Sequence, residues 1–374
     1  MIDASQFLEL LIQKEMTYFT GVPDSLLKEF GNALDQNNNV KSHVISPNEG
    51  TAVAVAIGYN LATNKIPVVY MQNSGLGNAL NPLISLAHQL VYKIPMLLII
   101  GWRGSPGLED EPQHLTQGMI TREILELVGI NYFVIDSQTE IDRVDHFLSQ
   151  SVRGNSPPCA ILISPGVFRE TKTYKVAEYT SDLSREEALQ GILASISERA
   201  IVVATTGKLS RELNELRETT DLAGRDFLTV GGMGHASAIA LGIARETPER
   251  LVICLDGDGA LQMHLGASAL IGECAPKNFV HVLINNGIHE SVGGQKIAAS
   301  KINYANLAIA FGYRNYQLVE SFMEIQETFY QFHGFDGPCF IEVRVNSKSR
   351  KNLSRPKANP LQNKLQFQSH IFNN

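Results

Sequence analysis

The stretch from Leu251 to Gln295 constrains the fold of this chain more than any other. An apolar run at 251–255 is followed by an acidic turn, a helical pattern and a second apolar run at 279–284. Apolar runs of this length are typical of buried parallel strands, so the pattern predicts a strand–helix–strand unit. The carboxyl ends of such strands meet at one edge of a sheet, where ligands bind. We therefore expect a site built from the residues that follow the two runs.

Oxygen donors follow both runs. The turn DGDG at 256–259 follows the first run, and the pair NN at 285–286 follows the second. Carboxylate and amide oxygens suit a Mg²⁺ ion whose coordination is completed by a bound phosphate. A solvated Asp-Gly turn is the alternative for the first run alone. A calcium loop is excluded because its twelfth position would be Ala267, and a dinucleotide fingerprint is disfavoured because two aspartates repel a pyrophosphate unless a metal intervenes.

The sequence GDG, then a helix, a strand and NN, resembles the diphosphate-binding signature of thiamine-diphosphate (ThDP) enzymes. The resemblance implies ThDP and Mg²⁺ as cofactors. It implies that the ion is held by the side chains of Asp258 and Asn286 and by the backbone carbonyl of Ile288. It also places Gly257 and Gly259, on either side of Asp258, against the cofactor.

Length and composition limit the other classes of function. A chain of 374 residues accommodates two domains of ordinary size, each with its own core. The formal net charge of −7 offers no field for nucleic acid or an anionic membrane, and no apolar run approaches the length of a membrane span. The first residues carry no secretory pattern, and the four cysteines have no CxxC spacing. We expect a cytoplasmic enzyme that binds neither nucleic acid nor membrane.

Strand-like and helical patterns alternate along the whole chain, which predicts an α/β protein with parallel sheets flanked by helices. The alternation stops in a polar, Thr- and Ser-rich segment and then restarts at a possible capping box formed by Ser184 and Glu187. The resemblance to ThDP enzymes then implies two ThDP-binding-fold domains with no central third domain. We expect a pyrimidine-binding domain at 1–167, a linker at 168–183, a diphosphate-binding domain at 184–346 and an extended tail at 347–374.

The N-terminal half holds a second group of candidate residues. Glu49 lies just after a predicted strand at the start of a helix, where a glutamate often serves only to favour the helix dipole. The pyrimidine domain of ThDP enzymes is similar, which implies that Glu49 binds N1′ of the aminopyrimidine. The sequence GGMG at 231–234 could be a simple tight turn. The family resemblance instead implies that the Gly231 carbonyl accepts from the 4′-amino group and that Met233 supports the folded cofactor.

Four further segments narrow the resemblance to the phosphonopyruvate decarboxylases, a family of ThDP-dependent 2-oxo-acid decarboxylases. They are GVPDSLL at 21–27, GWRG at 101–104, DEPQH at 110–114 and NGIHESVGGQ at 286–295. The sulfopyruvate decarboxylases share much of this set. The resemblance implies loss of CO₂ from phosphonopyruvate to give phosphonoacetaldehyde, a step in making C–P compounds, and so a small 2-oxo acid with an anionic head as the partner molecule.

Proton transfer and anion binding need further side chains. An acid must deliver a proton to the carbon that loses CO₂, and Asp24 and His114, both in loops after strands, are the candidates. A helix cap and an ordinary loop histidine are their alternative roles. A phosphonate dianion needs fixed positive charge or several N–H donors. The candidates, which the sequence does not rank, are Arg103, Lys208, His289 and Lys296.

Other functions stay open at this point. A sulfopyruvate decarboxylase would differ only in the anionic head of its substrate. An acetolactate-forming synthase is disfavoured because such relatives usually carry a third domain. A non-catalytic binding protein on the same fold would be expected to lack the metal pair or the pyrimidine glutamate, yet all are present. The family also implies a homodimer or homotetramer whose cofactors are shared between subunits.

Overall fold

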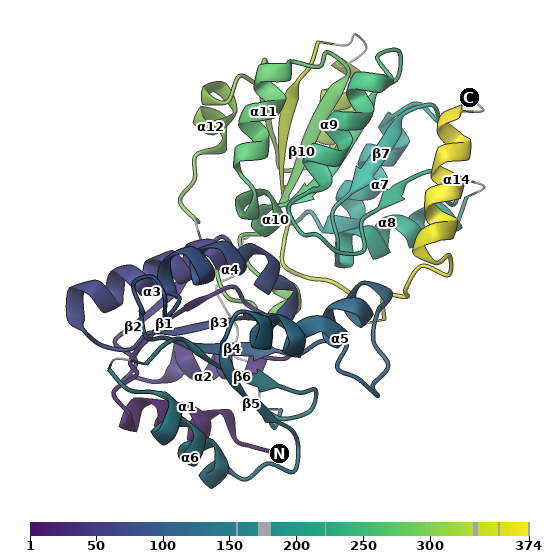
Figure 1. Ribbon diagram of the computed structural model, residues 1–374. Coiled ribbons are helices and arrows are strands. Elements are labelled where there is room, and N and C mark those ends of the chain that lie inside the picture. The colour runs from purple at the N-terminus through teal and green to yellow at the C-terminus, as the bar shows by residue number, and fades with distance from the viewer. Residues whose placement is uncertain are drawn as a thin grey trace. The chain divides into compact units, whose positions relative to one another are not determined.

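A computed structural model describes residues 1–154, 156–170, 181–220, 222–298, 300–331, 336–350 and 352–372, without the side chains of Ser291 and Gln331. The chain divides into two compact units. Unit 1 comprises Met1–Val176 with His289–Ala298, and unit 2 comprises Ala177–Ile288 with Ala299–Asn374. Each unit contains one six-stranded parallel sheet with helices on both faces, as Figure 1 shows, which confirms the predicted fold class. Most of the predicted linker at 168–183 lies outside the described residues.

Unit 1 has the strand order β2-β1-β3-β4-β6-β5. Its strands are β1 (Tyr18–Gly21), β2 (Ser42–Ile45), β3 (Val68–Gln72), β4 (Leu97–Gly101), β5 (Asn131–Ile135) and β6 (Cys159–Ile163). Its helices are α1 (Ala4–Gln13), α2 (Lys28–Gln36), α3 (Glu49–Thr63), η1 (Asn73–Gly75), α4 (Leu76–Pro82), the π-helix η2 (Leu83–Ala87), α5 (Pro112–Leu127), α6 (Ile141–Ser151) and η3 (Glu290–Val292). The chain leaves β1 toward β2 on one side and later enters β3 on the other, so a topological switch point lies between β1 and β3.

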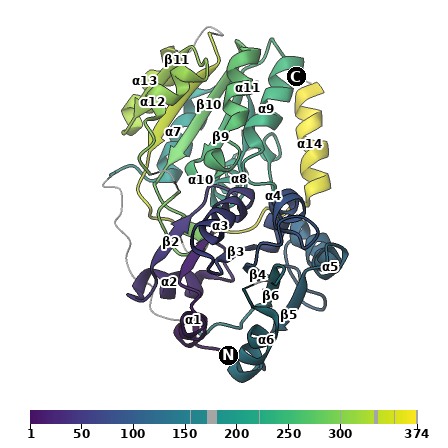
Figure 2. The ribbon, with the colours of Figure 1, turned by 60° about the vertical axis from the view of Figure 1, so that its left-hand side comes forward.

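The core of unit 1 has two layers because alternate residues of a strand point to opposite faces of the sheet. On β3, Val68 and Tyr70 pack with α1, α2 and α6, whereas Val69 and Met71 pack with α3, α4 and η2. Both faces are covered by helices (Figures 1 and 2), so the strands are nearly continuous apolar runs. This explains why the strands were predictable from apolar runs rather than from alternation.

Unit 2 has the strand order β11-β12-β10-β9-β7-β8. Its strands are β7 (Ile201–Ala204), β8 (Phe227–Leu228), β9 (Val252–Gly257), β10 (Phe279–Asn285), β11 (Asn315–Val319) and β12 (Cys339–Arg344). Its helices are α7 (Arg185–Ser195), α8 (Lys208–Glu218), α9 (Ala236–Glu246), α10 (Asp258–Met263), α11 (Gly266–Cys274), α12 (Tyr304–Ala310), α13 (Phe322–Gln331) and α14 (Pro360–Phe372). The predicted capping box at the start of α7 is present, with Ser184 and Glu187 bonding to each other's backbone.

The C-terminal part corrects one prediction. The tail at 347–374 was expected to be extended, but Pro360–Phe372 form helix α14, coloured yellow in Figure 2. Asn363 of this helix accepts from Leu228 N at 3.2 Å and donates to Asp226 O at 2.9 Å. These bonds satisfy backbone groups at the outer strand β8, which would otherwise be an open sheet edge. The prediction was wrong because the basic, proline-containing segment before α14 is not typical of the whole tail. The helical pattern begins only at Pro360.

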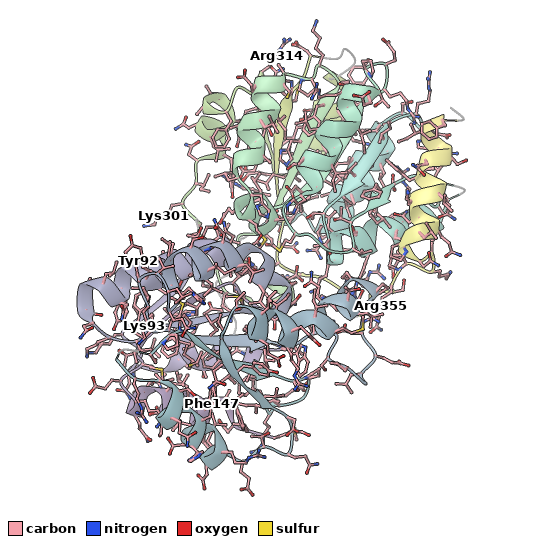
Figure 3. The ribbon with its side chains drawn as sticks, viewed as in Figure 1. Tyr92, Lys93, Phe147, Lys301, Arg314 and Arg355 are labelled. Atoms are coloured by element: carbon pink, nitrogen blue, oxygen red, sulfur yellow. The ribbon has the colours of Figure 1, made fainter. Side chains whose placement is uncertain are left out.

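Three features of the helices, the cysteines and the surface bear on the predictions made from composition. No helix in the described part of the chain combines the length and the apolar character that crossing a membrane requires. All four cysteines are free. A short apolar segment after η2 is exposed: Leu90 is 85% exposed and Tyr92, labelled in Figure 3, is 69% exposed.

Candidate functional site

Four adjacent strands of unit 1 end in polar residues at one edge of the sheet. Glu49 follows β2, Asp24 follows β1, Gln72 ends β3 and Arg103 follows β4. Because β2, β1, β3 and β4 are neighbours in the parallel sheet, their carboxyl ends lie side by side. The predicted residues Glu49, Asp24 and Arg103 therefore belong to one group of side chains.

Glu49 is the first residue of α3 and is only 5% exposed. Asn48 caps this helix by accepting from Thr51 N at 2.8 Å, so the glutamate is not needed as the cap. The Oε2 atom of Glu49 accepts from Asn78 Nδ2 at 2.7 Å. A Cβ atom at Gly75 would collide with the same carboxyl group. Binding a ring nitrogen requires a buried carboxyl group held in one position. A glutamate that only favours the helix dipole could remain exposed to solvent.

Asp24 is also buried, with 2% of its surface exposed. Its Oδ1 atom accepts from Gln72 Nε2 at 2.6 Å, and its Oδ2 atom accepts from Leu26 N at 3.0 Å. The bond to Leu26 is a local turn bond; helix α2 begins later, at Lys28, with Leu27 as its cap. Burial raises the pKa of Asp24, while the Gln72 and backbone bonds and the nearby Arg103 charge oppose that rise. Of these opposing effects on the pKa of Asp24, burial is the largest.

The guanidinium of Arg103 is committed to Asp110. Its Nε atom donates to Asp110 Oδ2 at 2.8 Å and its Nη2 atom to Oδ1, which makes a two-point ion pair. A further bond at 3.1 Å runs from Arg103 Nη1 to Ser25 Oγ. Burial alone would raise the pKa of Asp110, but hydrogen bonds from Arg103 and from the backbone N–H groups of Glu111 and Gly104 hold it well below its usual range. Arg103 therefore fixes the loop before α5.

His114 lies in the first turn of α5, and its Nδ1 atom is buried without a hydrogen-bond partner. Burial lowers the pKa of His114, and the positive charge of Arg103 lowers it further. The imidazole is therefore neutral near pH 7. Burial therefore shifts the two candidate acids of unit 1 in opposite directions, raising the pKa of Asp24 and lowering that of His114.

Unit 2 brings together the residues of the predicted metal site. Asp258 follows β9 and Asn286 follows the neighbouring strand β10, and both are buried. The Oδ2 atom of Asp258 accepts from Gly287 N at 2.7 Å and from Asn286 N at 3.2 Å, while its Oδ1 atom accepts from Gly259 N at 2.7 Å. Asn286 Oδ1 accepts from Ile288 N at 3.2 Å. These bonds fix the two side-chain ligands and the Ile288 backbone within one turn.

The residues of this turn fit a divalent cation. Burial raises the pKa of Asp258 to about 6, although three backbone N–H groups favour its ionised form. None of the hydrogen bonds and ion pairs described for Asp258 comes from a lysine or arginine, so a bound cation would supply the missing positive charge. An oxygen-only set of carboxylate, amide and carbonyl groups suits Mg²⁺ and leaves coordination positions for phosphate oxygens.

The GGMG turn at 231–234 adjoins this group. Gly234 has φ 88°, and an added Cβ would lie 2.8 Å from the Ala260 carbonyl oxygen of α10 and 2.8 Å from His264 Cδ2. Any larger residue would therefore push the turn away from the helix that Asp258 begins. Gly231 and Met233 are partly exposed, as contact with a cofactor requires.

The other three candidate anion binders belong to different units: Lys208 to unit 2, and His289 and Lys296 to unit 1. The Lys208 Nζ atom, at the start of α8, donates to Ser349 Oγ at 2.7 Å. Lys296 is exposed and groups with unit 1. His289 belongs to the same segment of unit 1, and burial lowers its pKa to about 4, so it carries no charge near pH 7.

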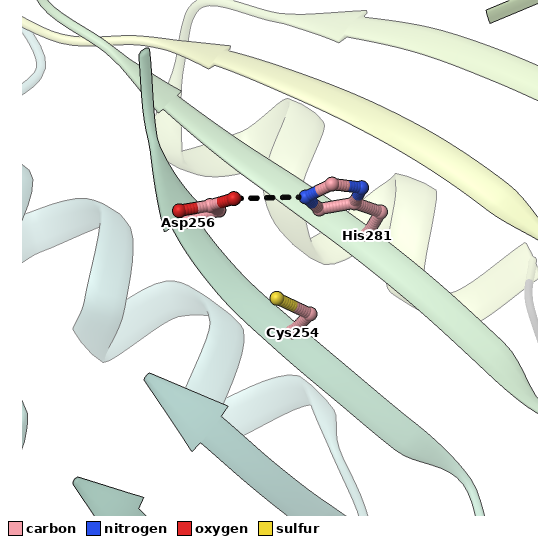
Figure 4. A group of neighbouring side chains, drawn as sticks. All are labelled: Cys254, Asp256 and His281. Carbon is pink, nitrogen blue, oxygen red and sulfur yellow. Dashed lines mark hydrogen bonds and ion pairs between the residues drawn. The ribbon is translucent and has the colours of Figure 1, made fainter. Parts of the chain in front are cut away.

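A second buried polar group lies behind the metal turn. Cys254 and Asp256 of β9 and His281 of β10 place possible ligand atoms within 4.8 Å of one another (Figure 4). His281 already bonds on both sides, with Nδ1 2.8 Å from Tyr313 OH and Nε2 3.4 Å from Asp256 Oδ2. Asp256 Oδ1 accepts from Gly257 N at 2.9 Å, and burial keeps the pKa of the Cys254 thiol well above its usual value. Its hydrogen bonds explain this group as a structural network without a metal.

Replacing His281 by leucine is expected to destabilise the protein by about 2–4 kcal/mol, because it leaves the Asp256 carboxyl group buried without its side-chain partner. Thermal unfolding followed by calorimetry measures the loss. His146→Leu is the matched control, since it makes the same change at an exposed histidine and should cost less than about 0.5 kcal/mol. A His281→Leu protein as stable as the unmodified one would contradict the role of this network.

The sequence did not identify three residues that form hydrogen bonds to the side chains of candidate site residues. Gln72 bonds to Asp24, Asn78 bonds to Glu49, and Asp110 bonds to Arg103. Gln72 gave a usable signal, since it is the polar residue that ends the apolar run of β3. The other two gave none, because their partners lie 29 and 7 residues away in the chain.

Family comparisons agree with this arrangement. The N-terminal TPP-binding domain of the thiamine pyrophosphate enzymes matches residues 3–126, and the C-terminal TPP-binding domain matches residues 205–343. The first match contains Asp24, Glu49 and His114, and the second contains Asp258 and Asn286. The chain belongs to the thiamine pyrophosphate enzymes, and it is a decarboxylase, a carboxy-lyase that acts on a small 2-oxo acid.

Two phosphonopyruvate decarboxylases and one sulfopyruvate decarboxylase are similar to this chain. Phosphonopyruvate decarboxylase from Streptomyces viridochromogenes is 34% identical over 99% of this chain and 95% of its own length. Phosphonopyruvate decarboxylase from Streptomyces hygroscopicus is 34% identical over 96% and 92%. Sulfopyruvate decarboxylase from Methanosarcina acetivorans is 30% identical over 79% of each chain. The resemblance to the first two spans both units.

Proposed function

We propose that this enzyme converts phosphonopyruvate to phosphonoacetaldehyde and CO₂ with ThDP and Mg²⁺, as a step in phosphonate biosynthesis. The observation that carries the proposal is the 34% identity to two phosphonopyruvate decarboxylases over nearly the whole chain. Similarity to the sulfopyruvate decarboxylase is lower and covers less of both proteins. The buried carboxyl groups at the sheet edges of both units support the cofactor chemistry.

Each unit has a separate task in this proposal. ThDP, when bound, supplies a nucleophilic carbon and an acceptor for the electron pair left by CO₂. The carboxyl group of Glu49, held by Asn78, binds the ring nitrogen of the aminopyrimidine. In unit 2, Asp258, Asn286 and the Ile288 carbonyl hold Mg²⁺, Gly257 and Gly259 adjoin the diphosphate, and Gly231 and Met233 contact the pyrimidine.

Asp24 is the proposed donor of the proton that replaces CO₂. Burial raises its pKa above that of an ordinary aspartate, as suits a proton donor, and it lies at the switch point of the unit-1 sheet. His114 is neutral near pH 7, so one ring nitrogen can donate a hydrogen bond and the other can accept one. Its proposed role is to form such a bond with the substrate.

For the anionic head of the substrate, Lys296 is the strongest of the four candidates. Arg103 is neutralised by Asp110, and His289 is uncharged near pH 7. Lys296 is exposed, so its ammonium group is accessible to an anion, whereas Lys208 donates to Ser349 Oγ.

A homodimer or homotetramer is part of the proposal. In this arrangement, Glu49 and Asp258 of one chain serve different cofactors, each completed by another subunit. The exposed apolar side chains of unit 1, such as Leu90 and Tyr92, offer material for such a contact. The free cysteines support a reducing, cytoplasmic location.

Turnover of phosphonopyruvate and sulfopyruvate, measured side by side, tests the substrate. We expect kcat/KM to be at least about tenfold higher for phosphonopyruvate, since its head carries a second charge that a lysine site favours. CO₂ release at neutral pH with saturating ThDP and Mg²⁺ provides the measurement. Faster turnover of sulfopyruvate would replace the proposed substrate with its sulfonate analogue, leaving the cofactor and the reaction type unchanged.

A further inference from the structure

The hydrogen bond between Asp24 and Gln72 spans the topological switch point of the unit-1 sheet. Asp24 follows β1, and Gln72 is the last residue of β3, the strand that pairs with β1 on the side away from β2. The bond is short, at 2.6 Å from Gln72 Nε2 to Asp24 Oδ1. Ligands of parallel sheets bind at such a point, so this pair occupies the place where a substrate is expected.

The orientation of the Gln72 amide is fixed from its other end. Ser74 Oγ lies 2.8 Å from Gln72 Oε1 and donates to it. The amide oxygen accepts from Ser74, and the amide nitrogen faces Asp24 and donates to it. Gln72 therefore presents a donor to the Asp24 carboxyl group, and a donor stabilises the ionised form of a carboxyl group more than the protonated form.

The surroundings leave Gln72 as the principal side chain that controls Asp24. Leu26 and Ser25 contribute backbone bonds, and Arg103 from β4 contributes a positive charge. The Arg103 guanidinium itself is held by its two-point ion pair with Asp110. On the remaining side, the carboxyl group touches Gly101, where any side chain would collide with it. Among the described residues, Arg103 is the charged group that acts on Asp24.

We propose that Gln72 is a positioning residue that holds the Asp24 carboxyl group in place and stabilises the carboxylate left after proton donation. The inference rests on the proposed role of Asp24. When the C–C bond to CO₂ breaks, its electron pair stays on the substrate side. That carbon then takes the proton of Asp24, which becomes a carboxylate bonded by the Gln72 N–H, and solvent returns the proton for the next turnover.

Titration of Asp24 in variants of its partners tests the inference. Burial raises the pKa of Asp24 and the Gln72 bond lowers it, so Gln72→Leu should move the pKa upward by about one pH unit relative to the unmodified protein. Ser74→Ala should cause a smaller upward shift, because the amide remains but loses its fixed orientation. Gln150→Leu is the matched control, since it removes an exposed amide bond to His146 and should cause none.

The carboxyl carbon of Asp24 gives a readout that does not need turnover. In full-length protein labelled with ¹³C-aspartate and loaded with ThDP and Mg²⁺, its resonance is assigned by its loss in Asp24→Asn and followed against pH. Loss of the protonated form should also lower kcat at high pH, so the alkaline limb of the kcat profile should move upward by the same amount in Gln72→Leu.

The two readouts separate the two claims. An unchanged pKa of Asp24 in both Gln72→Leu and Ser74→Ala would overturn the role of Gln72. A shifted resonance with an unmoved kcat limb would keep that role and overturn Asp24 as the proton donor. Because Ser74→Ala is a small change, it keeps the test decisive even if Gln72→Leu fails to fold.

Discussion

A protein with Glu49→Gln is expected to bind ThDP but to exchange the proton at C2 of the cofactor about 10²–10⁴ times more slowly. The substitution keeps the shape and the contact with Asn78 while removing the carboxylate that a ring nitrogen of the pyrimidine would share a proton with. Acid-quenched exchange in deuterated water, read by NMR on the bound cofactor, measures the rate. Calorimetry with ThDP and Mg²⁺ checks that binding persists.

The control for this experiment is Glu140→Gln. Glu140 is an exposed glutamate in the same unit and is the N-cap residue of α6, one position earlier than Glu49 in α3, so the change in charge near a helix start is matched. Its exchange rate should equal that of the unmodified protein. Unchanged exchange in Glu49→Gln would remove Glu49 from the chemistry and leave it as part of the helix start alone.

Asp258→Asn is expected to raise the dissociation constant of ThDP in the presence of Mg²⁺ by about 100-fold or more. The variant keeps one oxygen at the metal turn but loses the charge that a dication requires, and the diphosphate then lacks its bridge to the protein. Calorimetric titration of ThDP at fixed Mg²⁺ gives the constant directly. Titration with Mn²⁺, followed by its electron paramagnetic resonance signal, reports the metal without any turnover.

Thermal unfolding in EDTA distinguishes a lost ligand from a lost fold. Asp258→Asn removes a buried charge but turns an amide NH₂ toward a backbone N–H that the carboxyl group accepts from, so its stability in EDTA should stay close to that of the unmodified protein. Asp336→Asn, at an exposed ion pair with Arg314 in the same unit, is the control and should bind ThDP normally. Unaltered ThDP and Mn²⁺ binding in Asp258→Asn would place the metal elsewhere.

The fold was predictable where burial dictates composition. Strands covered by helices on both faces must be apolar throughout, and runs such as 252–255 and 97–100 therefore stood out in the sequence. Strand β11 and helix α8 were harder: β11 has only one buried residue, Val319, and α8 is rich in charge. Helix α4 ends at Pro82 and is followed directly by the π-helix η2, a type of helix that no pattern in the sequence indicates.

The candidate site was predictable to the extent that its residues follow strands. Asp24, Glu49 and Asp258 each come directly after an apolar run, and parallel strands bring such residues to one edge. The pairing of side chains was not accessible in the same way. Arg103 was a candidate anion binder from its sequence, but its guanidinium is paired with Asp110, and this pairing depends on loop geometry that the sequence does not give. The role of Gln72 depended equally on the adjacency of β1 and β3.

The most direct test of the whole account is product formation from phosphonopyruvate by protein freed of cofactor and metal. CO₂ and phosphonoacetaldehyde would be measured after adding nothing, ThDP alone, Mg²⁺ alone, or both. We expect one phosphonoacetaldehyde for each CO₂, formed rapidly only when ThDP and Mg²⁺ are present together. Equal CO₂ release without ThDP, or the absence of phosphonoacetaldehyde when both are present, would contradict the account.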